Sequence, residues 1–337
     1  MGANDLVRIG RSDIHISRLG LGTGPLGGLF EEVSTERAVQ TVLRAYDRGI
    51  RHFDTAPLYG FGLAEKRLGK ALQQIPRESV TVATKVGRLL RVLGEDEESQ
   101  ADVDRVHLAD AVPIFKGVGS ERPVWDFSYD AVRRSLEESL ERLGVDRVDL
   151  ALVHDPEDHM QPAVADAARA LIDLREEGVV GAVGVGTNHA WVGAQFVEST
   201  DVDFLLVAGR CTLLDRSATT ELLPMCTQKG VSVIAAGVFN SGILAEPDEN
   251  PMFWYEAAPE SAVARARQLR GICARYDVPL KAAALQFPFR LESIAAVVVG
   301  ARSPEEVDDD VEMLNVVIPE ELWRELGDAN EEEGAPS

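Results

Sequence analysis

Four side chains that could move a proton each follow a short apolar run in the first half of the chain. Asp54 and Tyr59 stand on either side of a turn, and Lys85 and His154 each end a longer apolar stretch. A phenol or an imidazole can act as a general acid or base, and nearby charges adjust its pKa. These residue types suit a reaction in which a proton moves to or from an oxygen atom.

Taken one at a time, the four residues have ordinary structural explanations, such as an Asp in a turn or a His in the core. A buried lysine is rare unless it is paired, so Lys85 needs a carboxylate, and Asp54 is the obvious partner. A cation held against Tyr59 would lower the pKa of the phenol from about 10 towards neutrality. His154 could orient a substrate oxygen by a hydrogen bond. Since all four follow consecutive predicted strands, we favour a shared acid–base site.

The elements that must position these residues alternate between strand and helix along the chain. The predicted strands are 19–24, 51–55, 80–86, 148–153, 179–186, 203–208, 231–236 and 294–299. The predicted helices are one between Ser34 and Gly49, 63–73, 130–143, one ending at Gly178, 190–198, 218–229, 260–276 and 304–314. Most of the strands are continuous apolar runs, as expected for parallel strands buried on both faces. The alternation predicts an α/β fold, a (β/α)8 TIM barrel, in a single domain of residues 1–337. A β-hairpin at 7–18 is predicted before the first barrel strand.

Two long connections interrupt this alternation, at residues 87–127 after the third strand and 242–259 after the seventh. Both follow strands and therefore lie on the C-terminal face, where barrel active sites are found. Long connections of this kind are often functional. Trp125 and Trp254, within them, are candidates for lining a substrate pocket with Tyr59 and His154, and simple packing is the alternative. The acidic run 95–98 is expected to be solvated surface.

One glycine motif has to be set aside. Residues 22–27 match the G-x-G-x-x-G pattern of dinucleotide-binding turns. That pattern requires a helix to begin within the glycines, so that its N-terminus faces the pyrophosphate. Here Pro25 interrupts, and the first predicted helix begins only after Ser34. We therefore reject a Rossmann fold.

Composition limits the class of protein. The chain has 337 residues, 45% hydrophobic and 27% charged, with a net charge of −22. Binding to nucleic acid or to an anionic membrane surface requires clustered Lys and Arg, so neither partner is expected. The three cysteines have no metal-binding spacing, and no apolar run reaches membrane length. We expect a cytoplasmic enzyme that acts on a small molecule without a metal; the sequence does not fix its oligomeric state.

Nearly the whole chain resembles the aldo-keto reductases. The blocks that carry the resemblance are Asp54-Thr55-Ala56-x-x-Tyr59-Gly60 and Gly184-x-Gly186-Thr187-Asn188. The resemblance implies a catalytic tetrad of Asp54, Tyr59, Lys85 and His154. It also implies that NAD or NADP binds extended across the mouth of the barrel.

The resemblance also implies cofactor contacts. Asn188, with Thr187, matches the position that hydrogen-bonds the carboxamide of the nicotinamide, and residues 300–306 match the loop around the adenosine ribose. The implied cofactor-binding residues are Gly22, Thr23, Asp54, Thr187, Asn188, Arg210, Val238, Asn240, Gly242, Gly300, Arg302, Ser303 and Glu306.

Within the family the chain looks most like the aldose and L-fucose dehydrogenases and pyridoxal 4-dehydrogenase. The insert after Lys85 and the blocks 153–156, 208–214 and 240–244 carry this closer likeness. It implies oxidation of a cyclic hemiacetal, from an aldose of the L-fucose, D-arabinose or galactose type or from pyridoxal, to a lactone. Tyr59 would accept the hydroxyl proton with help from Lys85.

Several positions depart from the family pattern. Ala208 stands where a Gln is usual, and Ala236 or Gly237 where an aromatic residue stacks on the nicotinamide; Arg210 and Val238 are the candidates to replace those contacts. Glu306 stands where NADP-binding members often have a basic residue, and an acidic environment repels a 2′-phosphate. Arg302 acts in the opposite direction. The balance favours NAD.

Two alternatives stay open. The same residues could work in reverse in an NADPH-dependent reductase of aldehydes or ketones, since proton and hydride transfer are reversible. A remoter alternative is a barrel that binds the cofactor as a sensor, without turnover.

Overall fold

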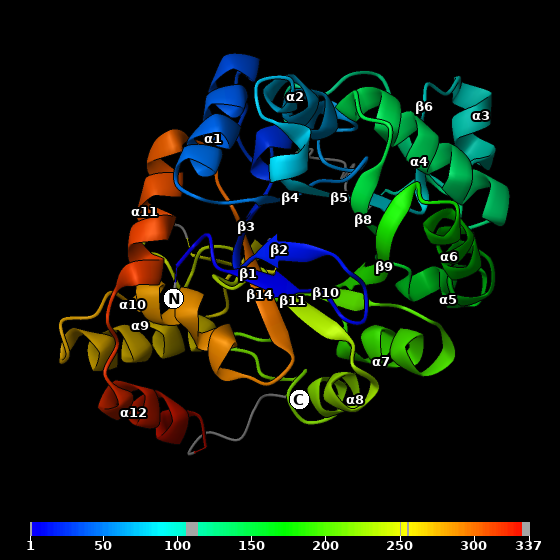
Figure 1. Ribbon diagram of the computed structural model, residues 1–337. Coiled ribbons are helices and arrows are strands. Elements are labelled where there is room, and N and C mark those ends of the chain that lie inside the picture. The colour runs from blue at the N-terminus through cyan, green and yellow to red at the C-terminus, as the bar shows by residue number, and fades with distance from the viewer. Residues whose placement is uncertain (1, 106–113, 250, 255, 332–337) are drawn as a thin grey trace.

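The computed structural model describes residues 2–105, 114–249, 251–254 and 256–331 of the chain. A closed barrel of eight parallel strands forms its centre (Figure 1). The barrel strands are β3 (Leu19–Gly22), β4 (His52–Asp54), β5 (Thr81–Val86), β8 (Val148–His154), β9 (Val180–Thr187), β10 (Phe204–Ala208), β11 (Ser232–Ala236) and β14 (Ile294–Gly300). The last strand pairs with the first, with Val297 opposite Leu19, and this pairing closes the barrel.

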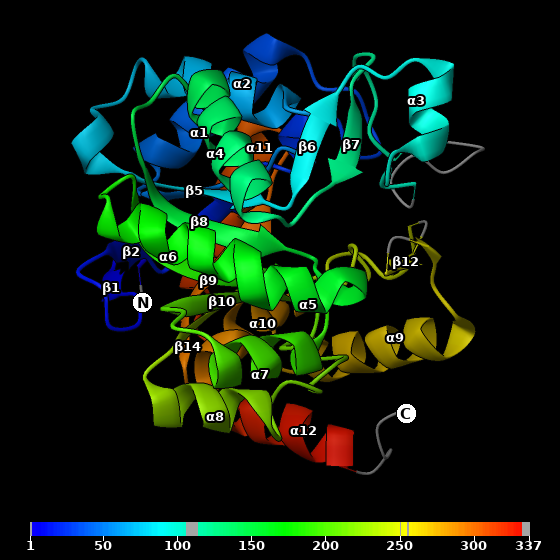
Figure 2. The same ribbon diagram turned by 90° about the vertical axis from the view of Figure 1, so that its right-hand side faces the viewer.

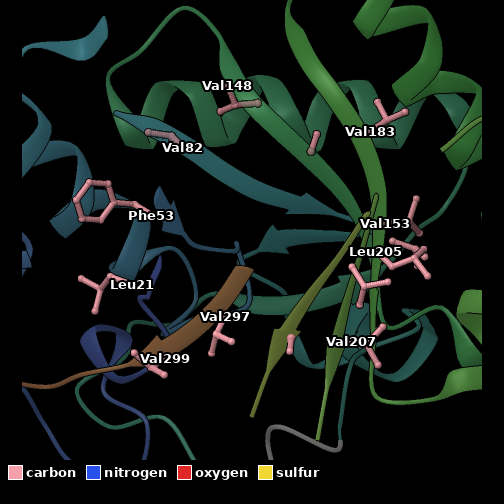
Figure 3. Close-up of a cluster of buried hydrophobic side chains, with 14 of the residues drawn as sticks. Leu21, Phe53, Val82, Val148, Val153, Val183, Leu205, Val207, Val297 and Val299 are labelled. Atoms are coloured by element: carbon pink, nitrogen blue, oxygen red, sulfur yellow. The ribbon is translucent and has the colours of Figure 1, made fainter. Parts of the chain in front are cut away.

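Side chains alternate between the two faces of each strand. One set is buried in the large cluster of which Figure 3 shows a part, with Leu21, Phe53 and Val297 among its members. The other set forms a separate buried cluster that includes Leu152 and Phe204. Because both faces are apolar, the strands take the continuous hydrophobic sequences that the prediction used.

Helices surround the barrel in both views (Figures 1 and 2). The helices that follow the strands are α1 (Thr35–Asp47), α2 (Leu63–Leu72), α4 (Tyr129–Leu143), α6 (Ala168–Glu176), α7 (Ala190–Ser199), α8 (Leu222–Lys229), α9 (Glu260–Ala274), α10 (Leu280–Gln286), α11 (Pro304–Asn315) and α12 (Glu320–Glu331), with the one-turn α5 (Met160–Pro162) before α6. Ser34 caps α1 by accepting a hydrogen bond from the amide of Arg37. The predicted barrel is thus confirmed, and the first α-helix begins beyond the glycine motif, as expected.

The N-terminal hairpin consists of β1 (Leu6–Arg8) and β2 (His15–Ser17) and lies across the barrel in Figure 1. Ile9 and Ile16 are fully buried in the inner cluster, beside Phe204 at the start of β10. The hairpin therefore closes the end of the barrel at which the strands begin.

Both long connections lie together on the opposite side of the barrel, at the right of Figure 2. The first contains α3 (Glu95–Gln100) and an antiparallel pair, β6 (Arg88–Arg91) and β7 (Arg122–Trp125). The second contains the short pair β12 (Met252–Phe253) and β13 (Glu256–Ala257).

Three helices are missing from the predicted series, and the first of them is the short α3 in the first long connection. Helix α10 buries five of its seven residues, so it has no polar face and produces no helical pattern in the sequence. Helix α12 follows the last predicted helix after a short connection. Over the part of the chain that the structure describes, no helix is long and apolar enough to cross a membrane.

Candidate active site

The floor of the candidate site is the last ring of side chains that point into the barrel. Each barrel strand contributes one residue near its C-terminal end, and all of them line one cavity of about 240 Å³. These residues are Gly22, Asp54, Lys85, His154, Gly186, Ala208, Ala236 and Gly300. The neighbouring strands β4, β5 and β8 provide the titratable side chains, and the other five strands have glycine or alanine at the same level. Three of those five strands also line the cavity at other levels, with Thr187, Leu206 and Val298. The floor therefore has a charged half and an open half.

Lys85 is the centre of the charged half and is almost completely buried. Its Nζ donates hydrogen bonds to Asp54 Oδ1 at 2.6 Å, to the carbonyl oxygen of Thr55 at 2.9 Å and to Tyr59 Oη at 3.0 Å. All three ammonium protons are used in this way. The predicted pairing of Lys85 with Asp54 is present, and the phenol lies within reach of the ammonium group.

A close backbone contact fixes the loop that carries Tyr59. Gly60 has a φ of 63°, and a Cβ there would collide with the carbonyl oxygen of Gly27. A Cβ at Gly27 would in turn lie 2.6 Å from the carbonyl carbon of Tyr59. Only two glycines allow this approach. The last glycine of the motif at 22–27 thus serves to position Tyr59. The motif contains only a single 3-10 turn at Pro25–Gly27, and no α-helix begins in it.

The pKa of Tyr59 differs from the prediction. Burial raises the pKa of the phenol and outweighs the lowering by Lys85, so the net shift is upward from 10.0. Burial also raises the pKa of Asp54 against the effect of Lys85, and the pKa of Lys85 is raised because its two partners outweigh the cost of burial. The predicted lowering of the Tyr59 pKa was therefore wrong in direction. At neutral pH the phenol keeps its proton and the lysine its charge.

His154 reaches the same cavity from the end of β8. Its ring lies edge-on to that of Tyr59, with the ring centroids 5.9 Å apart. Its Nε2 is 3.4 Å from Oδ2 of Asp155, the next residue. The structure thus brings the four predicted catalytic residues to one wall of the cavity.

The predicted cofactor residues divide into two groups. Gly22, Asp54, Thr187, Asn188 and Gly300 line the cavity. The others lie outside its lining: Thr23, Arg210, Val238, Asn240, Gly242, Arg302, Ser303 and Glu306. The hydroxyl of Thr187 donates to Glu157 at 2.6 Å, and Arg210 Nε donates to the carbonyl oxygen of Asn188 at 2.6 Å. Arg210 therefore holds the backbone that presents Asn188.

The open half of the site fits a nicotinamide dinucleotide. At the level of the charged residues, five strands have only glycine or alanine, and this leaves room for a flat ring beside Tyr59 and His154. Asn240 is 5% exposed, yet its Oδ1 has no hydrogen-bond partner among the residues described. Asn240, Ser241 and Gly242 all have positive φ angles, a conformation kept at an energetic cost and often found at ligand sites. An orphaned buried oxygen in this strained turn suits a ligand that crosses the mouth of the barrel.

The structure places neither tryptophan candidate in the lining of the cavity. Trp125 lies 3.6 Å from the guanidinium of Arg88 and stacks on Phe127. Trp254 lies over Arg210 at 4.0 Å and packs on Gly209, where a Cβ would be 2.7 Å from its ring.

Other residues of the lining did not emerge from the sequence. Four are the apolar residues Leu29, Leu58, Ile114 and Phe115, and one is Asp155. Asp155 follows His154 directly, so its position beside a predicted catalytic residue was the available signal.

Comparisons with known proteins agree with this geometry. A family model described as the aldo/keto reductase family matches residues 18–331. D-threo-aldose 1-dehydrogenase of a Pseudomonas species is 42% identical over 318 residues, which cover 93% of this chain and 94% of that protein. Pyridoxal 4-dehydrogenase of Microbacterium luteolum is 38% identical over 338 residues, with 96% and 97% covered. The solved structure of a glycerol dehydrogenase of Gluconobacter oxydans has a TM-score of 0.77 and 25% identity, covering 99% of this chain and 98% of that one.

Proposed function

The chain belongs to the aldo/keto reductase family and is an NAD(P)-dependent oxidoreductase acting on CH–OH groups, and from that premise we propose that it oxidises a cyclic hemiacetal to a lactone. The proposed substrates are aldoses of the L-fucose, D-arabinose or galactose type, or pyridoxal. The observation that carries the proposal is the buried Asp54–Lys85–Tyr59 chain, which ends at a cavity where the other five strands have glycine or alanine at the level of the charged residues. The names of the two curated relatives support this choice of substrate class.

The side chains divide the work as follows. A bound nicotinamide would take up the hydride from the reacting carbon. Tyr59 accepts the proton of the substrate hydroxyl, and the ammonium of Lys85 at 3.0 Å stabilises the phenolate before that transfer. His154 donates a hydrogen bond to the reacting oxygen and orients it. Asp54 keeps Lys85 charged and in place.

NAD is the proposed cofactor, because the only basic group of the ribose loop is engaged by acids. Arg302 Nη1 lies 3.4 Å from Glu31, and its Nε lies 3.4 Å from Glu306. Glu306 also accepts a hydrogen bond from the amide of Arg302 at 2.8 Å. A 2′-phosphate would have to compete with both carboxylates for one guanidinium.

The substitution Glu306→Gln tests the cofactor proposal. It removes the charge and keeps an oxygen for the amide of Arg302. We expect kcat/KM for NADP to rise about tenfold relative to that for NAD. Glu312→Gln, on the exposed face of the same helix, should leave the ratio unchanged. A ratio that Glu306→Gln does not alter would contradict the proposal.

A substrate panel tests the reaction itself. L-Fucose, D-arabinose, D-galactose and pyridoxal are each assayed with NAD and with NADP by the absorbance of the reduced nicotinamide. Lactone formation with at least one of them is expected, and aldehyde reduction should be the slower activity. Inert hemiacetals together with rapid NADPH-dependent reduction of simple aldehydes would replace this proposal with the reductase alternative. Tight cofactor binding without any turnover would favour the sensor.

A further inference from the structure

Asp155 places a carboxylate on the wall of the active-site cavity, and the tetrad does not use it. Its side chain is 20% exposed and lines the cavity, and its Oδ2 lies 3.4 Å from Nε2 of His154. In the proposed function the imidazole of His154 donates a hydrogen bond to the reacting oxygen. A group bonded to Asp155 would therefore lie close to the reacting carbon.

The backbone at Asp155 is held in a conformation that costs energy. Its φ is 44°, in the left-handed region, although Pro156 follows and normally favours an extended conformation at the preceding residue. The amide of Asp155 donates to the carbonyl oxygen of Gly186 at 2.9 Å. Such outliers cluster at functional sites, where the surrounding structure maintains them. This one turns the carboxylate towards the cavity.

Arg88 fixes the carboxylate from behind. Its side chain is 2% exposed, its Nε binds Asp104 Oδ2 at 2.7 Å, and its Nη2 lies 3.5 Å from Asp155 Oδ2. Its Nη1 also donates to the carbonyl oxygen of His154 at 3.3 Å, and the ring of Trp125 lies against the guanidinium. Asp104 and Trp125 come from the long insert after β5. The insert thus anchors a guanidinium that holds both His154 and Asp155.

The chemistry of this wall favours one kind of ligand group. A carboxylate accepts hydrogen bonds and donates none when it is ionised, so it selects a hydroxyl over a carbonyl, a carboxylate or a phosphate. Leu29, Leu58, Ile114 and Phe115, which also line the cavity, offer a hydroxyl no side-chain partner. A buried hydroxyl without a partner is costly. We propose that Asp155, held by Arg88, binds the substrate hydroxyl on the carbon next to the reacting carbon and so determines specificity for α-hydroxylated substrates. This inference rests on the proposed function.

The test crosses enzyme variants with paired substrates. The aldose identified by the panel is compared with its 2-deoxy form, for the wild type and for Asp155→Ala. The wild type should favour the hydroxylated sugar by about 10- to 100-fold in kcat/KM, the range for a hydrogen bond to a charged group. Asp155→Ala should lose most of that preference, because its kcat/KM should fall much further for the hydroxylated sugar than for the deoxy sugar.

Two further variants separate specificity from folding. Asp155→Asn tolerates the left-handed backbone and removes only the charge, so it should retain a reduced preference and carry the test if the alanine variant does not fold. Asp158→Asn removes an exposed charge three residues away and should leave kcat/KM unchanged for both sugars. Equal losses on both sugars in Asp155→Ala and in Asp155→Asn would overturn the inference, because they would indicate a role through His154 alone.

A second substrate pair keeps this result apart from the proposed function. If the wild type oxidises no sugar, the same variants are assayed for reduction of lactaldehyde and propionaldehyde, which differ by the α-hydroxyl. A preference for lactaldehyde that disappears in Asp155→Ala would uphold the role of Asp155 and contradict only the hemiacetal proposal. No preference in the wild type for either pair would overturn the inference.

Discussion

Lys85 donates its three protons to a carboxylate, a backbone carbonyl and a phenol. Replacing the phenol and replacing the lysine should therefore have different effects on stability. Tyr59→Phe removes only the hydroxyl that transfers the proton. We expect turnover to fall about 10²- to 10⁴-fold with little change in stability. Lys85→Met should cause a similar fall and also destabilise the fold by about 3 to 5 kcal/mol, because Asp54 remains buried without its partner. Turnover and denaturant unfolding measure the two effects. Full turnover in Tyr59→Phe would refute the assignment.

The raised pKa of Tyr59 predicts opposite pH profiles for the two directions of the reaction. Oxidation needs the phenol without its proton, a form that becomes common only above its raised pKa. The kcat/KM for oxidation should therefore keep rising with pH through 9. Reduction needs the protonated phenol and should stay level over the same range. An oxidation profile with a plateau near pH 7 would show that the bound state lowers the pKa of Tyr59 far more than these side chains do.

His52 should make the fold sensitive to acid. It is fully buried in the barrel, and burial, with a smaller effect of Lys85, lowers its pKa to about 3. The unfolded chain takes up the proton near pH 6.5 and the folded chain does not, so stability falls as the pH drops from 6.5 towards 3. Between pH 6.5 and 4.5 the loss should be about 2 to 3 kcal/mol. His52→Gln should reduce it and exposed His15→Gln should not, as measured by urea unfolding at each pH.

At this scale the sequence predicted residue types better than their environments. Asp54, Lys85 and His154 could be predicted because each ends a strand, and parallel strand ends meet at one face. The direction of the Tyr59 pKa shift could not, since it depends on how much of the loop at 57–61 and of the insert covers the phenol. Asp155 was visible in the sequence, but its role depends on a left-handed backbone and on Arg88.

Among the elements, the N-terminal hairpin separates stability from catalysis. Ile9 is fully buried where the hairpin meets the end of the barrel at which the strands begin. Tyr59 lies at the opposite end of the strands. Ile9→Ala should destabilise the protein by about 2 to 5 kcal/mol, the usual cost of a cavity in a core. Its kcat should be unchanged. Leu6→Ala, at an exposed position of the same hairpin, serves as the control. A fall in kcat for Ile9→Ala at a temperature where it stays folded would contradict this separation.

Helices and inserts were predicted with unequal success for a physical reason. Amphipathic helices such as α1 show a 3.6-residue stripe, whereas α10 is buried on most sides and shows none. The insert was located correctly by its length, and Trp125 within it was a candidate for lining the substrate pocket, with simple packing as the alternative. Trp125 instead packs on Arg88, a contact between chain segments that no local pattern reveals.

For the whole molecule, the net charge of −22 should oppose an anionic cofactor. Salt screens such long-range repulsion, with a Debye length of about 8 Å at physiological ionic strength. Raising the ionic strength from about 20 to 200 mM should therefore lower KM for the dinucleotide roughly two- to fivefold. KM for an uncharged sugar should not change. A dinucleotide KM that increases with salt would show that local basic groups outweigh the overall charge.

The hairpin closes the end of the barrel at which the strands begin, and this has a consequence for the order in which substrate and cofactor bind. Ile9 and Ile16 close that end, so among the described residues both reactants reach the cavity from the C-terminal ends of the strands. A dinucleotide bound across this opening would cover the cavity, so substrate and cofactor should bind and leave in a fixed order. Which reactant binds first depends on which end of the dinucleotide covers the opening. Product-inhibition patterns would reveal the order.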